Sequence, residues 1–256
     1  MNLYEAIYVR KSVRKFQMAA VDSKIMNHIK KYISTVTPLD DSIAYHIEII
    51  DAMQETVSFK GLWKVDAPYY LVFYCEEVEG AQLNAGYIME QVVLYLTCKG
   101  LGTCYQGALK VKPSSEAIAL GQKPYMVVAF GYGKENIERD AGQAKRYRMQ
   151  DIAIYKEEIG EEIKTMLRAA KIAPSTMNAQ PWRFVAYHNR IHIFLRREGF
   201  KPPFQKRLGD VNIGIVIAHL ALAAEELWLE ATIKTVDSIS EREFKNNQYI
   251  TTIFVQ

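Results

Sequence analysis

Two long, almost wholly apolar helical stretches, half a chain length apart, restrict the possible folds more than any other feature. The first begins at Ala81 and has Ala, Ala, Ile, Val and Tyr at positions 81, 85, 88, 92 and 95. The second begins near Asp210, the expected N-cap, and has Ile, Ile, Leu, Ala and Leu at positions 213, 217, 220, 224 and 227. Because neither stretch leaves much polar surface, both are predicted to be central, buried helices.

The two stretches also indicate an internal repeat. Four identities pair at one constant shift, which is half the length of the chain: Asn84 with Asn212, Gly86 with Gly214, Leu94 with Leu222, and Leu101 with Leu229. Chance could give four identities between two apolar helices, so the repeat depends also on the order helix, strand, long helix, strand, which occurs twice. We therefore predict two related α+β halves, residues 1–150 and 151–256, that pack as one structural unit.

Composition and charge exclude several classes of function. The formal net charge is 32 minus 29, or +3, which is too small to indicate a nucleic-acid or membrane partner by bulk electrostatics. No stretch approaches the roughly 20 apolar residues of a membrane span. The cysteines, Cys75, Cys98 and Cys104, have no metal-ligand spacing and form no even disulfide set. We expect a cytoplasmic protein without a metal site.

A basic segment near the N-terminus has a period of two. In R-K-S-V-R-K-F, Arg10 to Phe16, an extended backbone would place Arg10, Ser12, Arg14 and Phe16 on one side. Two guanidinium groups and a hydroxyl on one side suit a phosphate. The alternative is a solvated basic turn.

A second polar segment lies between two prolines. It reads K-I-A-P-S-T-M-N-A-Q-P-W-R-F from Lys171 to Phe184. Because Pro174 and Pro181 cannot lie inside a helix without losing a hydrogen bond, the polar residues between them belong to a bent connection, followed by a strand over 182–187. This connection could hold a flat, polar ligand, or its side chains could only cap a helix end.

Two further segments are candidates for ligand contacts. The first long helix ends at Gly100-Leu101-Gly102-Thr103, a glycine C-cap that leads to Gln106 and Gly107. Nearby glycines allow backbone N–H groups to approach a ligand closely, although the same residues could form a simple tight turn. Residues 134–150 are polar and charge-mixed, include Lys145-Arg146-Tyr147-Arg148, and are typical of an exposed connector.

Taken together, these segments resemble the nitroreductase superfamily of FMN-dependent oxidoreductases, over nearly the whole chain. R-x-S-x-R-x-F at Arg10–Phe16 resembles its N-terminal phosphate-binding segment, and A-P-S-x-x-N-x-Q-P-W at Ala173–Trp182 resembles its second, more specific flavin segment. G-L-G-T followed by Q-G at Gly100–Gly107 is similar to the loop along the isoalloxazine, and R-Y-R at Arg146–Arg148 to a basic pair near the C-terminus. The resemblance implies an α+β, nitroreductase-like fold.

One departure from the family pattern concerns the number of sites. Where the first half should carry A-P-S-x-x-N it has T-V-T-P-L-D-D, Thr35 to Asp41, and the second half begins at Asp151–Glu158 without arginine or serine. Each half supplies what the other lacks. The chain is therefore similar to single-chain, duplicated nitroreductase-like proteins, which implies an intramolecular pseudo-dimer with one FMN between its halves. A monomer is compatible with this arrangement.

The resemblance also implies roles for individual residues. The FMN phosphate would be bound by Arg10, Ser12, Arg146 and Arg148. Arg14 would lie about 7 Å beyond Ser12, at the usual strand rise, near the ribityl chain and pyrimidine edge. Lys64 would share that role, Pro174, Ser175 and Asn178 would contact the flavin from the other half, and backbone N–H groups at Gln106 and Gly107 would approach N5 and O4. Independently of the resemblance, Tyr105, Trp63 and Phe204 are candidate aromatic walls, and the alternative is that each serves core or loop packing.

The implied activity is a ping-pong reaction. NADH or NADPH would give a hydride to flavin N5 and leave before a nitroaromatic- or quinone-like acceptor binds. Because the flavin carries the chemistry, no catalytic side chain is assigned. No G-x-G-x-x-G fingerprint follows a predicted strand, so a nicotinamide would bind over the flavin. The alternatives are a flavin-binding sensor or storage module with little turnover, a dehalogenase, or a flavin-fragmenting enzyme.

Overall fold

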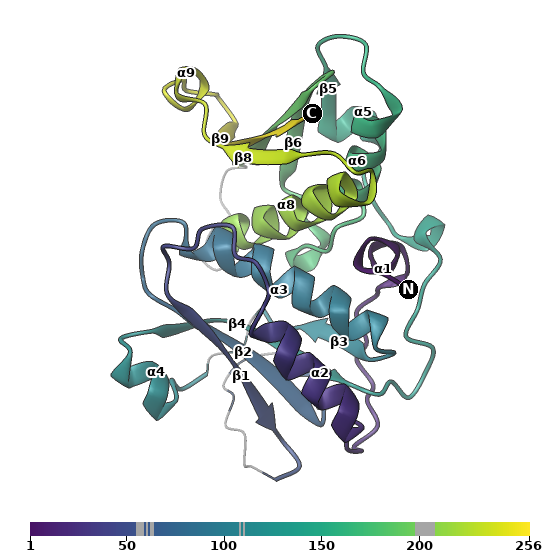
Figure 1. Ribbon diagram of the computed structural model, residues 1–256, viewed down its shortest axis with the longest axis vertical. Helices are drawn as coiled ribbons and strands as arrows, with labels where there is room; N and C mark the ends of the chain where they lie inside the picture. Colours follow the sequence, from purple (N-terminus) through teal and green to yellow (C-terminus); the bar gives the residue numbers. More distant parts are fainter. Residues whose placement is uncertain (55–58, 60, 62–63, 108, 110, 198–207) are drawn as a thin grey trace. The chain divides into compact units, whose positions relative to one another are not determined.

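The computed structural model describes residues 1–54, 59, 61, 64–107, 109, 111–197 and 208–256, which form two compact units, 1–143 and 144–256 (Figure 1). The boundary lies between Gln143 and Ala144, within the basic arm, and not after Gln150 as the sequence suggested. The reason is local: the basic end of the arm is hydrogen-bonded to residues of the second unit, so it belongs to that unit.

The first unit is an antiparallel sheet in the order β1-β2-β4-β3, with helices packed on it. Its strands are β1 (Tyr45–Asp51), β2 (Tyr69–Cys75), β3 (Gly102–Tyr105) and β4 (Lys123–Gly131). Its helices are α1 (Leu3–Val9), α2 (Ser23–Ile33), α3 (Ala81–Cys98), α4 (Ser115–Ala119) and a 3₁₀ turn at Ala141–Gln143. The long helix α3 packs on the sheet, and α1 and α2 pack on α3 (Figure 1).

Local sequence signals account for these elements. The Asp22 carboxylate accepts hydrogen bonds from the backbone N–H groups of Lys24 and Ile25, which starts α2 as predicted. Every residue of β2 is buried, in agreement with its unbroken apolar sequence. After α3, Gly100 has a φ of +75°, so it is the predicted glycine C-cap.

The second unit has a sheet in the order β5-β6-β7-β9-β8. Its strands are β5 (Ala153–Tyr155), β6 (Trp182–Tyr187), β7 (Arg190–Arg196), β8 (Ala231–Lys234) and β9 (Asn247–Val255). Its helices are α5 (Met149–Ile152), α6 (Glu161–Lys171), α8 (Gly209–Glu226), α9 (Asp237–Ser240) and a 3₁₀ turn at Thr176–Asn178. The buried helix α8 packs against α6 and against β6 and β7.

Apart from β5, the second unit repeats the topology of the first. The antiparallel order β6-β7-β9-β8 matches β1-β2-β4-β3, and the middle pairing of each sheet has one register irregularity, after Phe73 and after Ile193. Both central helices have 18 residues and both shorter helices have 11. The repeated order of elements predicted from the sequence is therefore present. That the halves pack as a pseudo-dimer stays a prediction.

The helix ends repeat as well. After α3, Leu101 N–H donates to the Leu96 carbonyl oxygen at 3.0 Å, and after α8, Leu229 N–H donates to the Ala224 oxygen, also at 3.0 Å. The left-handed residue in the second turn is Trp228, with a φ of +58° where the first helix has a glycine.

The predicted N-cap of the second long helix is wrong. The N-cap of α8 is Leu208, which makes no side-chain capping bond, and Asp210 lies in the first helical turn. A carboxylate is favourable in the first turn as well as at the N-cap, because both face the positive end of the helix dipole. For this reason, the presence of Asp210 near the start of the helix does not show whether it is the N-cap or a first-turn residue.

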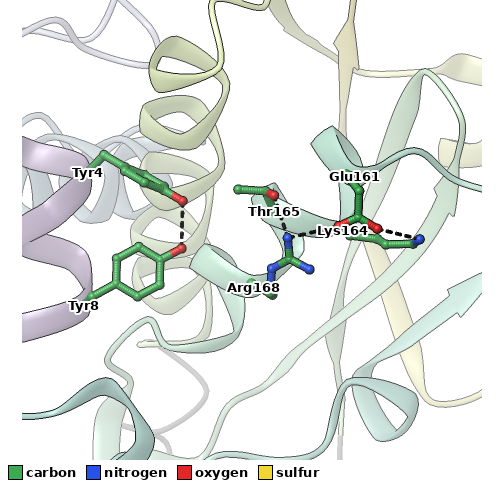
Figure 2. A network of polar contacts seen from close by, with 6 residues as sticks. All are labelled: Tyr4, Tyr8, Glu161, Lys164, Thr165 and Arg168. Atoms are coloured by element: carbon green, nitrogen blue, oxygen red, sulfur yellow. Dashed lines mark hydrogen bonds and ion pairs between the residues drawn. The ribbon is translucent and has the colours of Figure 1, made fainter.

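Polar side chains lie on the surfaces of the shorter helices (Figure 2). On α1, the hydroxyls of Tyr4 and Tyr8 are 2.9 Å apart. On α6, Arg168 donates to the Thr165 hydroxyl at 2.7 Å and to Glu161 at 3.4 Å. In the described part of the chain, no helix is both long and apolar enough to cross a bilayer.

Candidate functional site

The Arg10–Phe16 segment is extended, as predicted, but its side chains do not alternate. Isolated bridges join Arg10 to Glu138, Ser12 to Thr103 and Phe16 to Gly133. Val13 and Phe16, expected on opposite sides, are both buried in one core cluster. The physical reason is that each bridge is made to a different segment, so no single neighbouring strand imposes a regular pleat.

Arg10 has a buried guanidinium without a hydrogen bond to the described residues. Only 3% of the residue is exposed, and its ion-pair partner is Glu90 of α3, with Nε 3.9 Å from Oε1. Its Nη1 is buried and has no hydrogen-bond partner in this part of the chain. A guanidinium has five N–H donors, and leaving them unused in the interior is costly.

Glu90 connects Arg10 to the G-L-G-T strand. The hydroxyl of Tyr105 donates to Glu90 Oε2 at 2.5 Å, and Glu90 itself is fully buried. Burial, and then the Glu90 charge, raise the pKa of Tyr105 well above its ordinary value, so the phenol stays protonated. Sequence reasoning missed Glu90, because one acidic residue in an apolar helix gives no sign of what it faces, and it offered Tyr105 as an aromatic wall.

The loop after β3 is held by side-chain and backbone bonds. Gln106 is buried, and its Oε1 accepts from the N–H of Val65, the residue after Lys64, at 2.9 Å. The Gln106 N–H donates to the Val127 oxygen at 2.8 Å. It is therefore not available to a flavin, contrary to the prediction. In this loop the N–H of Gly107 remains the candidate. Trp63 and Phe204 lie outside the described residues.

Gly102 permits the N-terminal segment to approach β3. A Cβ atom at this position would lie 2.8 Å from Val13 Cγ2, which is shorter than any ordinary contact. Val13 N–H donates to the Thr103 oxygen at 2.8 Å across the same approach. The G-L-G-T motif therefore has a packing reason in addition to its glycine C-cap.

Arg14 is exposed and forms no hydrogen bond or ion pair with the described residues, whereas its neighbour Lys15 pairs with Glu135 at 2.8 Å. Burial raises the pKa of the Cys104 thiol, and the positive charges of Arg14 and Arg10 partly oppose this rise. Both arginines therefore contribute to the positive potential at the end of β3. Lys64 is exposed, and its Nζ lies 3.5 Å from Asp66 Oδ1.

In the second unit, the structure brings Arg146 and Asn178 together. Arg146 Nη1 donates to Asn178 Oδ1 at 2.8 Å and Nη2 donates to the Ile172 oxygen at 3.1 Å. Ser175 Oγ accepts from the N–H of Gln180 at 2.9 Å. Pro174 is half-buried just after α6. Arg148 is instead exposed and pairs with Asp151 through two nitrogens at 3.0 Å.

The connection between the prolines has an unusual backbone. Met177, Asn178 and Gln180 all have positive φ, at +52°, +56° and +47°. Such angles cost about 1–2 kcal/mol for each residue that is not glycine. Bonds from the surrounding chain hold this conformation, since Gln180 Oε1 accepts from Tyr147 N–H at 2.8 Å and Asn178 Nδ2 donates to the Lys145 oxygen at 3.0 Å. Clusters of strained residues are typical of ligand sites.

One asparagine in each central helix holds the corresponding loop. Asn212 Oδ1 accepts from Thr176 N–H at 3.0 Å and from its hydroxyl at 3.3 Å. In the first unit, Asn84 Oδ1 accepts from the N–H groups of Leu39 and Asp40 at 2.8 and 3.2 Å. The sequence already paired these asparagines through the half-chain shift. Only the structure shows that each one binds the loop that precedes it in the chain.

Comparisons with known proteins identify a family and a fold. Residues 2–224 match the model of the family described as "Putative TM nitroreductase". A solved structure titled as a putative nitroreductase from Thermotoga maritima MSB8 is 21% identical, with 100% of this chain and 94% of that chain covered and a TM-score of 0.64. At this identity the likeness establishes the fold.

Two other solved structures match less of the chain. A nitroreductase family protein from Streptococcus pneumoniae TIGR4 is 15% identical, covers 61% of this chain and 100% of its own, and has a TM-score of 0.49. An FMN-dependent nitroreductase from Clostridium difficile R20291 is 14% identical, covers 54% and 94%, and has a TM-score of 0.41. No protein with a curated function matches. Because the family model covers most of its length, this chain belongs to the "Putative TM nitroreductase" family.

Proposed function

We propose that the protein is an FMN-dependent NAD(P)H oxidoreductase of the nitroreductase type that binds one FMN per chain. The residues proposed to bind the cofactor come from both units and are Arg10, Ser12, Arg14, Lys64, Gly107, Arg146, Arg148, Pro174, Ser175 and Asn178, with Gln106 positioning the loop. Support comes from the family to which the chain belongs and from the chemistry of these side chains.

The observation that carries the proposal is the buried Arg10 guanidinium, whose N–H groups make no hydrogen bond within the described residues. Glu90 at 3.9 Å is too far for a hydrogen bond, so it supplies charge compensation without satisfying the donors. A phosphate would satisfy them, because phosphate oxygens and a guanidinium form short, charge-assisted pairs. Ser12, two residues along the same extended segment, would add a hydroxyl donor.

The loop of the second unit would bind a different part of the cofactor, because it presents a rigid polar edge. Its positive φ angles and its bonds to Arg146, Tyr147 and Asn212 fix the side chains of Ser175 and Asn178 before any ligand arrives. A preorganised edge loses little conformational entropy on binding. The corresponding loop of the first unit has Asp40 and Asp41 in this region, and added carboxylates would repel an anionic cofactor. This difference supports one cofactor per chain.

When bound, FMN would accept a hydride from NADH or NADPH and deliver it to a nitroaromatic- or quinone-like acceptor. The side chains of the protein bind and orient. Arg10 would neutralise charge on the phosphate, Ser12 would donate a hydrogen bond to it, and Arg14 would hold a fixed positive charge where reduced cofactor carries negative charge. Because Tyr105 keeps its proton, Glu90 stays hydrogen-bonded, and the Arg10 charge is held in one place.

The decisive experiment is to purify the full chain with FMN and measure the flavin-to-protein ratio and anaerobic bleaching. We expect a ratio near one, with loss of the flavin absorbance on addition of NADH or NADPH. A ratio near two would contradict the single site. A yellow protein that neither nucleotide bleaches would show a sensor or storage module instead, and a protein with no affinity for FMN would refute the proposal altogether.

Arg14→Ala tests an individual contact, because Arg14 is exposed and its removal breaks no hydrogen bond or ion pair of the described residues. We expect FMN affinity or the rate of reduction to fall about tenfold, the effect of one charge-assisted bond. Lys15→Ala is the matched control, since the adjacent lysine pairs with Glu135. Equal values for the wild type and Arg14→Ala in both assays would remove Arg14 from the site.

A further inference from the structure

The second unit has a cavity of about 780 Å³ on the face of its sheet that is turned away from α8. Along β6, the alternate residues Trp182, Phe184 and Ala186 are buried, and Arg183, Val185 and Tyr187 between and after them line the cavity. Its two rims are the α5–β5 segment and the segment that joins α9 to β9. The volume is within the range of cavities that hold small organic ligands, about 300–1,000 Å³.

The first unit fills the corresponding face of its sheet with its own core. Matched by the register irregularity of each sheet, His192 and Phe194 of β7 correspond to Val72 and Tyr74 of β2. Val72 and Tyr74 belong to a hydrophobic cluster against which Phe59, from the long β1–β2 connection, also packs. The β6–β7 connection is only residues 188–189, so it supplies no such cover.

The residues that replace this core are donors and aromatic rings. His192 is only 6% exposed, yet it lines the cavity. Its Nδ1 is 2.7 Å from the Thr252 hydroxyl, which is 2.6 Å from the Tyr249 hydroxyl, which accepts from Val236 N–H at 3.0 Å. In one consistent arrangement of these contacts, Tyr249 donates to Thr252 and Thr252 donates to Nδ1. The imidazole proton then lies on Nε2.

That Nε2–H group makes no hydrogen bond within the described part of the chain. Burial, and then the charge of Arg190, lower the pKa of His192, so the ring stays neutral at pH 7. Because His192 lines the cavity, a ligand there can accept a hydrogen bond from this group. With the proton on Nε2, the cavity therefore offers one hydrogen-bond donor to a ligand.

The charged residues that line the cavity are mostly basic. Lys156, Arg183, Arg196 and Arg242 line it, with a single carboxylate, Asp151, that Arg148 already pairs. Arg183 donates to the carbonyl oxygens of Gln180 and Trp182, so it contributes mainly its charge. The side chains of Lys156 and Arg242 have no partner among the residues described. Converging cations with no free carboxylate select an anion.

We propose that this cavity binds a planar aromatic carboxylate, at a site separate from that of the cofactor. The ring would lie against the aromatic residues Tyr187, Phe194 and Phe244, which line the cavity. The carboxylate would accept from His192 Nε2–H and pair with Arg242 or Lys156. A neutral ligand of the same shape would leave the cations uncompensated, so charge is the basis of selectivity.

Calorimetric titration of the full chain with 2-naphthoate, with FMN present in saturating amount, tests the site. We expect binding of 2-naphthoate and at least tenfold weaker binding of neutral 2-naphthamide. Arg242→Gln and Lys156→Gln should each raise the Kd for 2-naphthoate about five- to tenfold. The matched control is Lys245→Gln, an exposed lysine nearby that does not line the cavity, and it should change the Kd less than twofold.

A second readout does not depend on substitution. In a ¹⁵N-histidine spectrum, 2-naphthoate should shift the Nε2 signal of His192 more than that of any other histidine. The proposal is overturned by absence of heat at millimolar 2-naphthoate, by equal affinity for the amide, or by a Lys245→Gln effect as large as that of Arg242→Gln. Because FMN is already saturating, none of these results depends on the proposed reaction.

Discussion

The paired asparagines of the central helices permit a test with a control built into the same chain. Asn212→Ala removes the acceptor of Thr176 N–H and of the Thr176 hydroxyl, at 3.0 and 3.3 Å. An N–H group left without a partner in the interior costs about 1–3 kcal/mol, and because Thr176 is half-buried, water will compensate in part. We expect the free energy of unfolding to fall by about 1–2 kcal/mol.

The same substitution should weaken FMN binding. Without Asn212, the loop that presents Ser175 and Asn178 must adopt its positive φ angles on binding, and about 1.4 kcal/mol corresponds to a tenfold rise in Kd. Asn84→Ala breaks three bonds to the loop of the first unit, at 2.8, 3.2 and 3.0 Å, and should lower stability by about 2–3 kcal/mol.

Urea unfolding and titration with FMN, followed by flavin fluorescence, measure the two effects separately. The prediction is a dissociation of effects: Asn84→Ala is the less stable variant and keeps its FMN affinity, whereas Asn212→Ala is the more stable and loses affinity. If both variants lose FMN affinity to the same extent, or if Asn212→Ala binds FMN normally, the second-unit loop does not hold the cofactor.

Three further predictions concern stability. Gly102→Ala places a methyl group 2.8 Å from Val13 Cγ2 and should lower the free energy of unfolding by about 1–3 kcal/mol. Adding Val13→Ala should recover part of this loss. A Gly102→Ala variant as stable as the wild type would refute the packing argument. Trp228→Gly should raise the free energy of unfolding by about 1 kcal/mol, since Trp228 is 95% exposed and left-handed, and a lower melting temperature would contradict this. Burial raises the pKa of Cys75 to about 12 from its ordinary 9.0, so above pH 9 the unfolded state loses this proton first and the free energy of unfolding should fall as pH rises. Cys75→Ala should show a smaller fall at alkaline pH, and parallel plots of stability against pH for the two proteins would exclude Cys75 as the cause.

The sequence alone predicted much of the architecture, because the signals involved are local. The Asp22 cap, the Gly100 C-cap and the strand at 182–187 follow from backbone preferences within a few residues. The apolar faces of the long helices and their half-chain shift indicated a duplicated α+β fold, and both units have that topology. The R-x-S-x-R and A-P-S-x-x-N segments indicated the family, which the family model confirmed.

Only the tertiary structure decided what individual polar groups face. It paired Arg148 with Asp151, assigned the Gln106 N–H to Val127, and buried Arg10 beside Glu90, and in the last two cases the partner comes from a distant part of the sequence. It also left one sheet face open in the second unit where the first unit closes it. Backbone preferences act over a few residues, whereas hydrogen bonds and ion pairs depend on which distant segments pack together. That is why the pattern of the chain determined its fold and its family, and the packing alone determined the chemistry of each side chain.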